Sequence, residues 1–184
     1  MLFVISAPSG AGKTTVIREI FKVFPNINFS ISATTRGKRN DEQNGKDYYF
    51  ISKDEFDKKI KNDEFIEWEE VHGHLYGTLK SELKKGETQD ILLDVDVKGA
   101  ISIKKLYPQA ITIFIEAPRE EMIDRLKRRR TEDEKEMMKR IARIDLELGY
   151  RKDFDHVVMN KSSDEGVKEA LNKIINIINK YKLN

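Results

Sequence analysis

The sequence predicts an α/β fold in which a parallel sheet forms the core and helices cover both of its faces. Short apolar runs alternate with amphipathic stretches along the 184 residues, as in layered α/β domains. A glycine-rich segment joins the first apolar run to an amphipathic stretch, and the last amphipathic stretch has apolar residues at helical spacing. Strands that are connected through helices run parallel, so we expect one buried parallel sheet.

Five apolar runs are predicted to be the strands of this sheet, and they cover residues 2–6, 29–33, 91–95, 111–115 and 157–159. The stretches between them carry helix signals. Ser52 followed by Glu55 is a capping-box pattern, which predicts a helix over 53–62. The final helix should pack an apolar stripe on the sheet, and this stripe consists of Val167, Ala170, Leu171, Ile174, Ile175 and Ile178.

Two segments interrupt the alternation of strands and helices. Residues 34–85 contain two predicted short strands, at 48–51 and 65–71, and residues 120–151 are highly charged. Each segment has few large apolar residues to bury, which indicates an insertion on the core rather than an independently folding domain. The charge run at 127–135 is equally consistent with a solvated helix face and with a functional basic cluster.

The composition excludes several classes of function. The 34 basic and 32 acidic residues leave a net charge of +2, so no global positive field is available to bind nucleic acid. The absence of cysteine excludes disulfides, thiolate nucleophiles and cysteine-zinc sites, and it fits a reducing compartment. No apolar run approaches the roughly 18 residues of a membrane-spanning helix. We therefore expect a cytoplasmic protein without a nucleic-acid or membrane partner.

A phosphate-binding loop is predicted between the first strand and the helix that follows it. Residues 7–14 match the pattern G-x-x-x-x-G-K-[ST] at every position but the first, where Ala7 replaces glycine. In this context, backbone N–H groups and the helix N-terminus converge on phosphate oxygens. Lys13 supplies charge and Thr14 supplies a ligand for Mg²⁺. The predicted ATP-binding residues of the loop are Ala7, Pro8, Ser9, Gly10, Ala11, Gly12, Lys13, Thr14 and Thr15.

The first inserted segment contains candidate ligands for a second phosphate group. Arg36 and Arg39 are three residues apart in a predicted loop, where two guanidinium forks can clamp a phosphate dianion. The hydroxyl of Tyr48 can complete this shell. An ordinary basic loop is the alternative interpretation of the same residues.

A carboxylate in the same segment is a candidate reader of a purine base. Glu67 lies in an apolar strand, where a carboxylate is costly to bury unless it meets hydrogen-bond donors. Guanine offers adjacent N1–H and N2 amino donors, and adenine lacks this pair. A hydroxyl from Ser32 or Thr78 can donate to guanine O6, which sharpens the discrimination against adenine.

Several sequence blocks together resemble the guanylate kinase family over essentially the whole chain. In the family's order and at its spacing, the blocks are SAPSGAGKTT, SATTRGKR, NGKDYYF, FIEW, YGT, DVDVKG and a basic lid. The resemblance implies transfer of the γ-phosphoryl group of ATP to GMP, and also to dGMP, giving ADP and GDP for GTP and dGTP synthesis. The GMP-binding residues that it implies are Ser32, Arg36, Arg39, Tyr48, Glu67, Tyr76, Thr78 and Asp96.

The resemblance also implies how the chain is organised. The implied fold is that of a P-loop nucleoside-monophosphate kinase, with a parallel sheet core, a GMP-binding insertion and a lid. One domain covers residues 1–184. Its parts are a core at 1–33, 86–121 and 153–184, the insertion at 34–85 and the lid at 122–152.

The resemblance assigns arginines of the charged segment to catalysis. Together with two residues named above, they form an implied catalytic set of Lys13, Arg36, Arg125, Arg129 and Arg140. Arg128 and Arg130 depart from the family, which commonly has glycines there, and this difference bears on lid motion. Asn160 matches a family position near the adenine of ATP, although a residue in a strand-ending turn is an equally good interpretation.

The expected chemistry needs charge compensation more than proton transfer. The acceptor phosphate is largely ionised near neutral pH, because its second pKa is about 6, so no strong general base is required. Two polyanions must be brought in line, which calls for Mg²⁺, a lysine and arginines in a water-poor site. Asp94 ends an apolar strand, where its carboxylate can support the Mg²⁺ shell together with Thr14, directly or through water.

Other interpretations stay open at this stage. A noncatalytic guanylate-kinase-like interaction module is disfavoured because Lys13 and Thr14 are retained, and a kinase for another nucleoside monophosphate is disfavoured by Glu67. His72 and His74 flank a turn glycine without clustered carboxylates or cysteines, which favours a solvated hairpin over a metal site. The sequence is equally consistent with a monomer and with a homo-oligomer.

Overall fold

The computed structural model describes residues 1–39, 42–71, 73–84, 89–128 and 134–182. In chain order, the first half contains β1 (Leu2–Ser6), α1 (Lys13–Val23), β2 (Asn28–Ser30), β3 (Ala33–Thr34), β4 (Tyr49–Phe50), α2 (Lys53–Lys61), β5 (Phe65–Val71), β6 (His74–Leu79) and α3 (Lys80–Lys84). The second half contains β7 (Ile91–Asp94), α4 (Val97–Leu106), β8 (Ile111–Glu116), α5 (Arg119–Arg128), α6 (Glu134–Gly149), the 3₁₀ helix η1 (Tyr150–Asp153), β9 (His156–Met159) and α7 (Asp164–Lys182).

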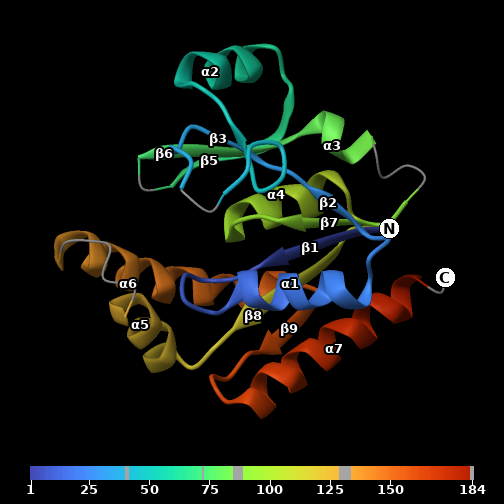
Figure 1. Cartoon of the computed structure of the whole chain (residues 1–184), viewed down its shortest axis with the longest axis vertical. Coiled ribbons are helices and arrows are strands. Elements are labelled where there is room, and N and C mark those ends of the chain that lie inside the picture. The colour runs from blue at the N-terminus through green and yellow to red at the C-terminus, as the bar shows by residue number, and fades with distance from the viewer. Residues whose placement is uncertain (40–41, 72, 85–88, 129–133, 183–184) are drawn as a thin grey trace.

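The core is a five-stranded sheet in the order β2-β7-β1-β8-β9, and all its strands are parallel. Side chains alternate across β1, so Phe3 and Ile5 pack with α1 and α7 on one face, whereas Val4 packs with α4 on the other. Figure 1 shows α1 and α7 on one side of the sheet and α4 on the opposite side. The predicted parallel sheet with helices on both faces is thereby confirmed.

Local sequence signals explain several of these elements. The capping box that opens α2 is present, because Ser52 Oγ accepts from the N–H of Glu55 while the Glu55 carboxylate accepts from the N–H of Ser52. The apolar stripe of α7 is buried at Ala170, Ile174 and Ile178, as its helical spacing predicts.

The predicted strand over 29–33 is wrong. β2 ends at Ser30, and the chain then leaves the core sheet and joins a second sheet at Ala33. The buried carboxylate of Glu82 lies at this break, where it accepts from the N–H of Ile31 at 3.1 Å and from the hydroxyl of Tyr49 at 3.0 Å. The backbone at Ile31 is therefore satisfied by a side chain instead of by a strand ladder.

The second sheet has the order β4-β3-β6-β5 and is built from residues between Ala33 and Leu79. A small separate core supports it, in which Phe56 of α2 stacks on Phe65 of β5 with ring centroids 4.4 Å apart. β5 also packs against α4, which joins this sheet to the core. The side chains of β5 that face α4 therefore lie between the second sheet and a helix of the core.

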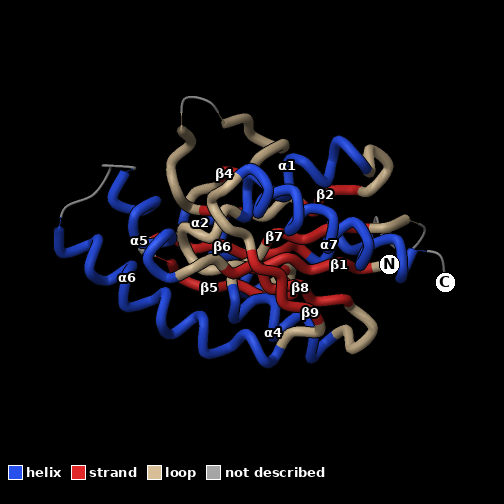
Figure 2. Tube along the Cα trace, turned by 90° about the horizontal axis from the view of Figure 1, so that it is seen from below, coloured by secondary structure: helices blue, strands red, loops and turns tan. Residues whose placement is uncertain are grey.

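Helices α5 and α6 pack side by side and extend away from the core sheet, as Figures 1 and 2 show. Arg119 of α5 donates from Nε and Nη2 to the carboxylate of Asp145 of α6 at 2.6 and 2.8 Å. This pair is exposed, so it links the two helices at their surface and contributes little to their packing. Within the described part of the chain, no helix is both long enough and apolar enough to cross a membrane.

Candidate functional site

The phosphate-binding loop lies between β1 and α1, at the carboxyl edge of the core sheet. Gly10 and Gly12 have positive φ angles of 85° and 88°, a conformation that favours glycine. A Cβ atom on Gly12 would lie 2.5 Å from Nδ2 of Asn160, so the loop also needs glycine there for space. Asn160 is 2% exposed and donates to the carbonyl of Ala11 at 2.7 Å. This contact holds the loop shape, and it supports the structural interpretation of Asn160.

The loop encloses a cavity of about 230 Å³. Its lining residues are Ala7, Pro8, Ser9, Gly10, Gly12, Lys13, Thr14, Thr15, Val71, Asp96, Arg143 and Glu147. Lys13 Nζ donates to the carbonyl of Val95 at 3.0 Å and forms an ion pair with Asp94 at the end of β7. The lysine is therefore held across the sheet edge, where its charge points at the cavity rather than into solvent.

Oxygen ligands for a magnesium ion are available next to this lysine. Thr14 lies exposed in the first turn of α1, and the carboxylate of Asp94 ends the neighbouring strand β7. No cluster of three or more His, Cys, Asp or Glu side chains suited to a metal occurs among the described residues. One hydroxyl and one carboxylate fit Mg²⁺, which binds through few protein ligands and keeps water and substrate phosphates as the others.

A second cavity of about 230 Å³ adjoins the first one. Its lining residues are Lys13, Ser32, Tyr48, Glu67, Glu69, Val71, Tyr76, Gly77, Asp94, Val95 and Asp96. Lys13 and Asp96 therefore line both cavities. Five residues of the predicted GMP site come together here from β5 and β6 of the second sheet, from the segments just before β3 and β4, and from the start of α4, namely Ser32, Tyr48, Glu67, Tyr76 and Asp96.

Glu67 of β5 is partly buried in the wall of the second cavity. Thr78, which is fully buried on the paired strand β6, donates from Oγ1 to Glu67 Oε1 at 2.6 Å. Burial raises the pKa of Glu67 to about 7, although this hydrogen bond opposes the rise. The carboxylate is thus poised to ionise fully when further donors reach it.

Arg36 is held by an internal carboxylate. Its Nη1 and Nη2 atoms donate to the two oxygens of Glu42 at 3.0 and 2.6 Å, and the hydrogen bond from Arg36 holds the pKa of Glu42 below its usual value. The backbone N–H of Arg39 donates to the same carboxylate at 2.8 Å, while the Arg39 side chain is exposed. The guanidinium of Arg36 also lies 5.5 Å from the ring centroid of Tyr48. The Glu42 carboxylate therefore occupies the two guanidinium N–H donors of Arg36 that a phosphate group can use.

Two of the predicted lid arginines can be located. Arg125 of α5 donates from Nη1 to the carbonyl of Gly10 at 2.9 Å and from Nη2 to Ser162 Oγ at 2.8 Å, so it lies directly against the phosphate-binding loop. Arg140 is partly buried on α6. Arg129 lies outside the described residues.

The two arginines that differ from the family pattern and the two histidines of the hairpin lie only partly within the described residues. Arg128 is exposed at the end of α5, whereas Arg130 lies outside the described residues. His74 begins β6, and His72 also lies outside the described part of the chain. Gly73, between the two histidines, has a φ angle of 76°, as expected for the turn of the β5–β6 hairpin.

Sequence reasoning missed four charged residues near the site: Glu42, Glu69, Arg143 and Glu147. Arg143 of α6 donates from Nε to Glu147 at 2.7 Å and from Nη2 to Asp96 at 3.4 Å. Only the i, i+4 spacing of Arg143 and Glu147 was visible in the sequence, and it indicates a surface helix pair rather than a site. Glu42 lay within a charged loop that gave no sign of its partner.

Comparisons with known proteins agree with this geometry. A family model described as guanylate kinase matches residues 1–180. The guanylate kinase of Thermotoga maritima is 42% identical over 180 residues, which are 96% of this chain and 85% of that protein. The guanylate kinase of Fusobacterium nucleatum is 44% identical over 182 residues, which are 96% of this chain and 95% of that protein.

Solved structures show the same fold. The crystal structure of guanylate kinase from Anaplasma phagocytophilum superposes with a TM-score of 0.78 at 29% identity, covering 100% of this chain and 87% of that one. Shikimate kinase from Bacteroides thetaiotaomicron gives a TM-score of 0.56 at 9% identity and covers 97% and 98% of the two chains, so the likeness concerns the fold alone. The predicted P-loop kinase fold is confirmed.

Proposed function

This chain belongs to the guanylate kinase family and is a nucleoside monophosphate kinase, and we propose that it transfers the γ-phosphoryl group of ATP to GMP and dGMP. The products are ADP and GDP or dGDP, which feed the synthesis of GTP and dGTP and recycle GMP. The observation that carries this proposal is the pair of adjoining cavities that share Lys13, because a phosphoryl group must pass between two bound nucleotides.

ATP binds in this proposal along the loop from Ala7 to Thr15. The backbone N–H groups of the loop and the N-terminus of α1 face the phosphates, and Lys13 compensates their charge. Asn160 lies behind the loop and keeps its shape through the carbonyl of Ala11. Thr14 and Asp94 would hold Mg²⁺, directly or through water, and a bound ion would supply compensation for the charge of the phosphates.

The second cavity takes the acceptor nucleotide. Glu67 accepts from guanine N1–H and N2, the hydroxyl of Ser32 donates to the base edge, and Thr78 orients the Glu67 carboxylate by donating its hydroxyl to it. Thr78 is fully buried and its one O–H donates to Glu67, so it serves this site by holding the carboxylate in place. Asp96 lies at the start of α4, on the wall that the two cavities share.

The phosphate of the acceptor replaces the Glu42 carboxylate on Arg36. Arg39 and the hydroxyls of Tyr48 and Tyr76 complete the shell, with the two tyrosine rings 6.0 Å apart in an edge contact. A phosphate dianion has more charge and more acceptor oxygens than a carboxylate, so this exchange favours the bound nucleotide.

Positive groups from both sides carry the transfer step. Lys13 and Arg125 lie at the loop, and Arg129 and Arg140 join them from the lid when it closes. The acceptor oxygen is already ionised near neutral pH, so charge compensation and alignment do most of the catalysis. Closure excludes water and prevents simple hydrolysis of ATP. The division into a core at 1–33, 86–121 and 153–184, an insertion at 34–85 and a lid at 122–152 belongs to this proposal, as does a cytoplasmic location.

Incubation of the purified chain with ATP, Mg²⁺ and each nucleoside monophosphate in turn tests the proposal. ADP release confined to GMP and dGMP supports it, and a preference for AMP or UMP contradicts the assignment of Glu67 to guanine. Failure of every acceptor, with nucleotide-independent binding of peptides, would show a noncatalytic module instead. The same reaction with EDTA should lose activity, because the phosphates then lack Mg²⁺.

A further inference from the structure

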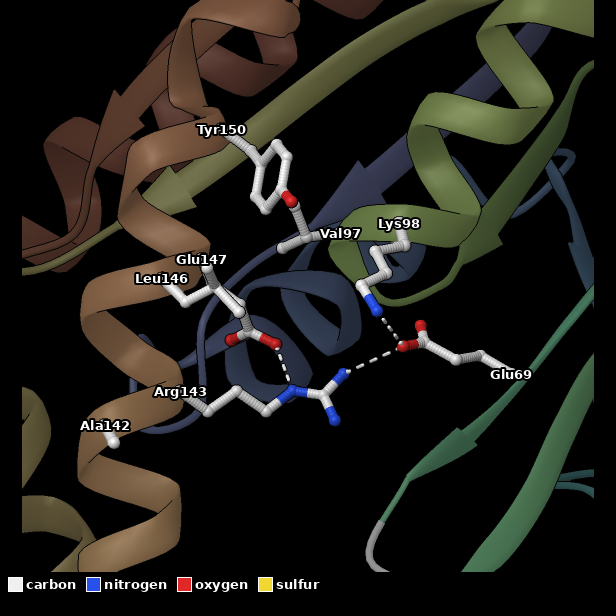
Figure 3. A pocket seen from close by; sticks show the side chains of 8 residues that line it. All are labelled: Glu69, Val97, Lys98, Ala142, Arg143, Leu146, Glu147 and Tyr150. Atoms are coloured by element: carbon white, nitrogen blue, oxygen red, sulfur yellow. Dashed lines mark hydrogen bonds and ion pairs between the residues drawn. The ribbon is translucent and has the colours of Figure 1, made fainter.

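A third cavity of about 350 Å³ lies between α6, α4 and β5, and a network of charged side chains crosses its wall (Figure 3). Arg143 of α6 is the centre of this network. Its Nε atom donates to Glu147 at 2.7 Å, and its Nη2 atom lies 3.4 Å from Asp96 Oδ2 and 3.8 Å from Glu69 Oε1. One lid-segment side chain therefore touches both the start of α4 and the acceptor-side strand β5.

The acceptor cavity has an excess of negative charge. The carboxylates of Glu67, Glu69, Asp94 and Asp96 line it, and Lys13 is the basic residue among its lining residues. Lys13 is already paired with Asp94. The expected ligand is itself an anion, so repulsion within this wall opposes its binding unless further positive charge is present.

Arg143 supplies this charge in a fixed geometry. Glu147 has a side chain that is 9% exposed, and it holds the Nε side of the guanidinium from one turn further along α6. The opposite side then faces Asp96 and Glu69. Asp96 in turn caps α4, because its Oδ1 accepts from the N–H of Gly99 at 2.7 Å. The guanidinium is thus tied to the backbone of the acceptor site through a single carboxylate.

We propose that Arg143 is a positioning residue for the acceptor nucleotide, which compensates the paired carboxylates of Asp96 and Glu69 and thereby keeps the acceptor cavity able to admit an anion. The inference rests on the proposed function of that cavity, and it adds a lid-segment residue to the determinants of acceptor binding. Arg143 acts through Asp96 and Glu69 rather than on the transferred group.

The charge state of Glu69 reports on this role. Burial first, and the neighbouring carboxylate of Asp96 second, raise the pKa of Glu69 to about 7, and Lys98 opposes the rise. The charged groups that face Glu69 among the described residues are Asp96 and Lys98 from α4 and Arg143 from α6. Loss of Arg143 removes a favourable partner of the ionised form and raises this pKa further. A proton on Glu69 then replaces part of the missing positive charge.

Binding of GMP by calorimetry at pH 6.5 and pH 8.5, together with steady-state kinetics, tests the proposal on the full chain. For Arg143→Met, we expect the Kd and the KM of GMP at pH 8.5 to rise about tenfold. This factor is what a lost interaction equivalent to roughly one pKa unit gives in an equilibrium constant. At pH 6.5 the ratio of variant to wild type should shrink to about threefold or less, because Glu69 is then protonated. Because Arg143 also lines the cavity of the phosphate-binding loop, we expect the KM of ATP to rise too, but by less than the KM of GMP and equally at the two pH values.

Two further variants complete the test. Arg143→Lys keeps the charge without the fork and should recover part of the GMP affinity. Arg119→Met is the matched control, because it removes another arginine that contacts α6, through an exposed pair with Asp145, and neither residue of this pair lines one of the three cavities. We expect wild-type affinity for GMP from this control. A thermal melt of each variant shows whether it is folded.

Three results overturn the inference: an unchanged GMP affinity in Arg143→Met, a loss of GMP affinity that is equal at the two pH values, or an equal loss of GMP affinity in the Arg119→Met control. If Arg143→Met does not fold, Arg143→Lys still tests the inference. A GMP affinity between that of wild type and complete loss of binding at pH 8.5 supports it. Either wild-type affinity or complete loss in Arg143→Lys contradicts it. Failure of the wild-type chain itself to bind GMP would instead contradict the proposed function of the cavity.

Discussion

The two adjoining cavities that we propose as the nucleotide sites are built on different principles. The phosphate-binding loop is made of backbone, because two glycines with positive φ angles aim its N–H groups and Asn160 and Arg125 hold its carbonyls from behind. The acceptor cavity is made of side chains, and its main recognition groups already have internal partners. Arg36 is bound by Glu42, and Glu67 by Thr78.

This difference explains how one protein can handle two anions of different kinds. A backbone cradle binds any polyphosphate of the right shape and needs little rearrangement. A side-chain pocket can distinguish bases, but its polar groups must be satisfied while it is empty, because a buried unpaired group costs about 1–3 kcal/mol. Internal partners meet this need, and the ligand then exchanges with them. We expect changes in the loop to affect rate and changes in the pocket to affect selection.

The largest effect should come from Lys13→Ala. The lysine compensates charge at the point where the two cavities meet, so its loss should lower kcat on the order of a thousandfold. The fold should survive, since the side chain is partly exposed and contacts only the end of β7. Steady-state kinetics combined with a thermal melt checks this. A folded variant with near-normal kcat would remove Lys13 from the transfer step.

A smaller but more selective effect is expected from Glu67→Gln. The amide presents an N–H₂ group where guanine also presents donors, so the KM of GMP should rise about a hundredfold, while the KM of ATP stays within about twofold. Kinetics with each nucleotide varied in turn measures the two constants. Equal weakening of both nucleotides would mean that Glu67 does not read the base.

Gly99→Ala should separate GMP binding from stability. A Cβ atom on Gly99 would lie 2.7 Å from Glu67 Oε2 and 3.1 Å from Asp96 Oδ1, so the Glu67 carboxylate must move. Alanine is favoured over glycine in a helix by up to about 1 kcal/mol, so the melting temperature should not fall greatly. We expect GMP affinity to drop about tenfold by calorimetry with ATP unaffected. Unchanged GMP affinity would show that the Glu67 carboxylate can move away from the added methyl group without weakening its contact with guanine.

The smallest expected effect is a pH dependence that originates in Glu67. The guanine donors need the ionised carboxylate, and its pKa is raised to about 7, so GMP affinity should increase severalfold between pH 6 and pH 8. Titration of the GMP phosphate adds to this slope, and Glu67→Gln is the control that retains only the phosphate contribution. Parallel slopes in the two proteins would contradict the assignment.

The same pKa predicts a change in stability of the opposite sign. Because the pKa of Glu67 is higher in the folded chain than its ordinary value, the folded state favours the protonated group. The resulting stabilisation is complete below about pH 4.5 and is lost as the pH rises through about 7. Thermal melts should therefore show wild type losing stability relative to Glu67→Gln between pH 5.5 and pH 8.

Contiguous signals made much of the fold predictable. The phosphate-binding loop, the capping box at Ser52 and the stripe of α7 each depend on residues a few positions apart, so their meaning is visible in the sequence. The strand over 29–33 failed because Glu82, 51 positions after Ile31, takes over a backbone N–H at the break. No pattern in the residues around Ile31 indicates that a carboxylate so distant in the sequence will bind its N–H.

The residues of the proposed acceptor site could be named from the sequence, but their contacts in the empty cavity could not. Arg36 and Glu67 were visible as candidate ligands, whereas the pairing of Arg36 with Glu42 depends on how a loop folds back. Arg143 reaches Asp96 across 47 positions because α6 and α4 lie on opposite walls of the third cavity. Such contacts follow from tertiary packing, which a single sequence does not display.

A crystal structure of the chain with GMP tests the exchange of partners most directly. We predict that the phosphate lies on the Arg36 guanidinium with the Glu42 carboxylate displaced, and that guanine N1 and N2 lie within about 3 Å of the Glu67 oxygens, as hydrogen bonds require. The account is contradicted if GMP binds while Arg36 remains paired with Glu42 and the base lies away from Glu67.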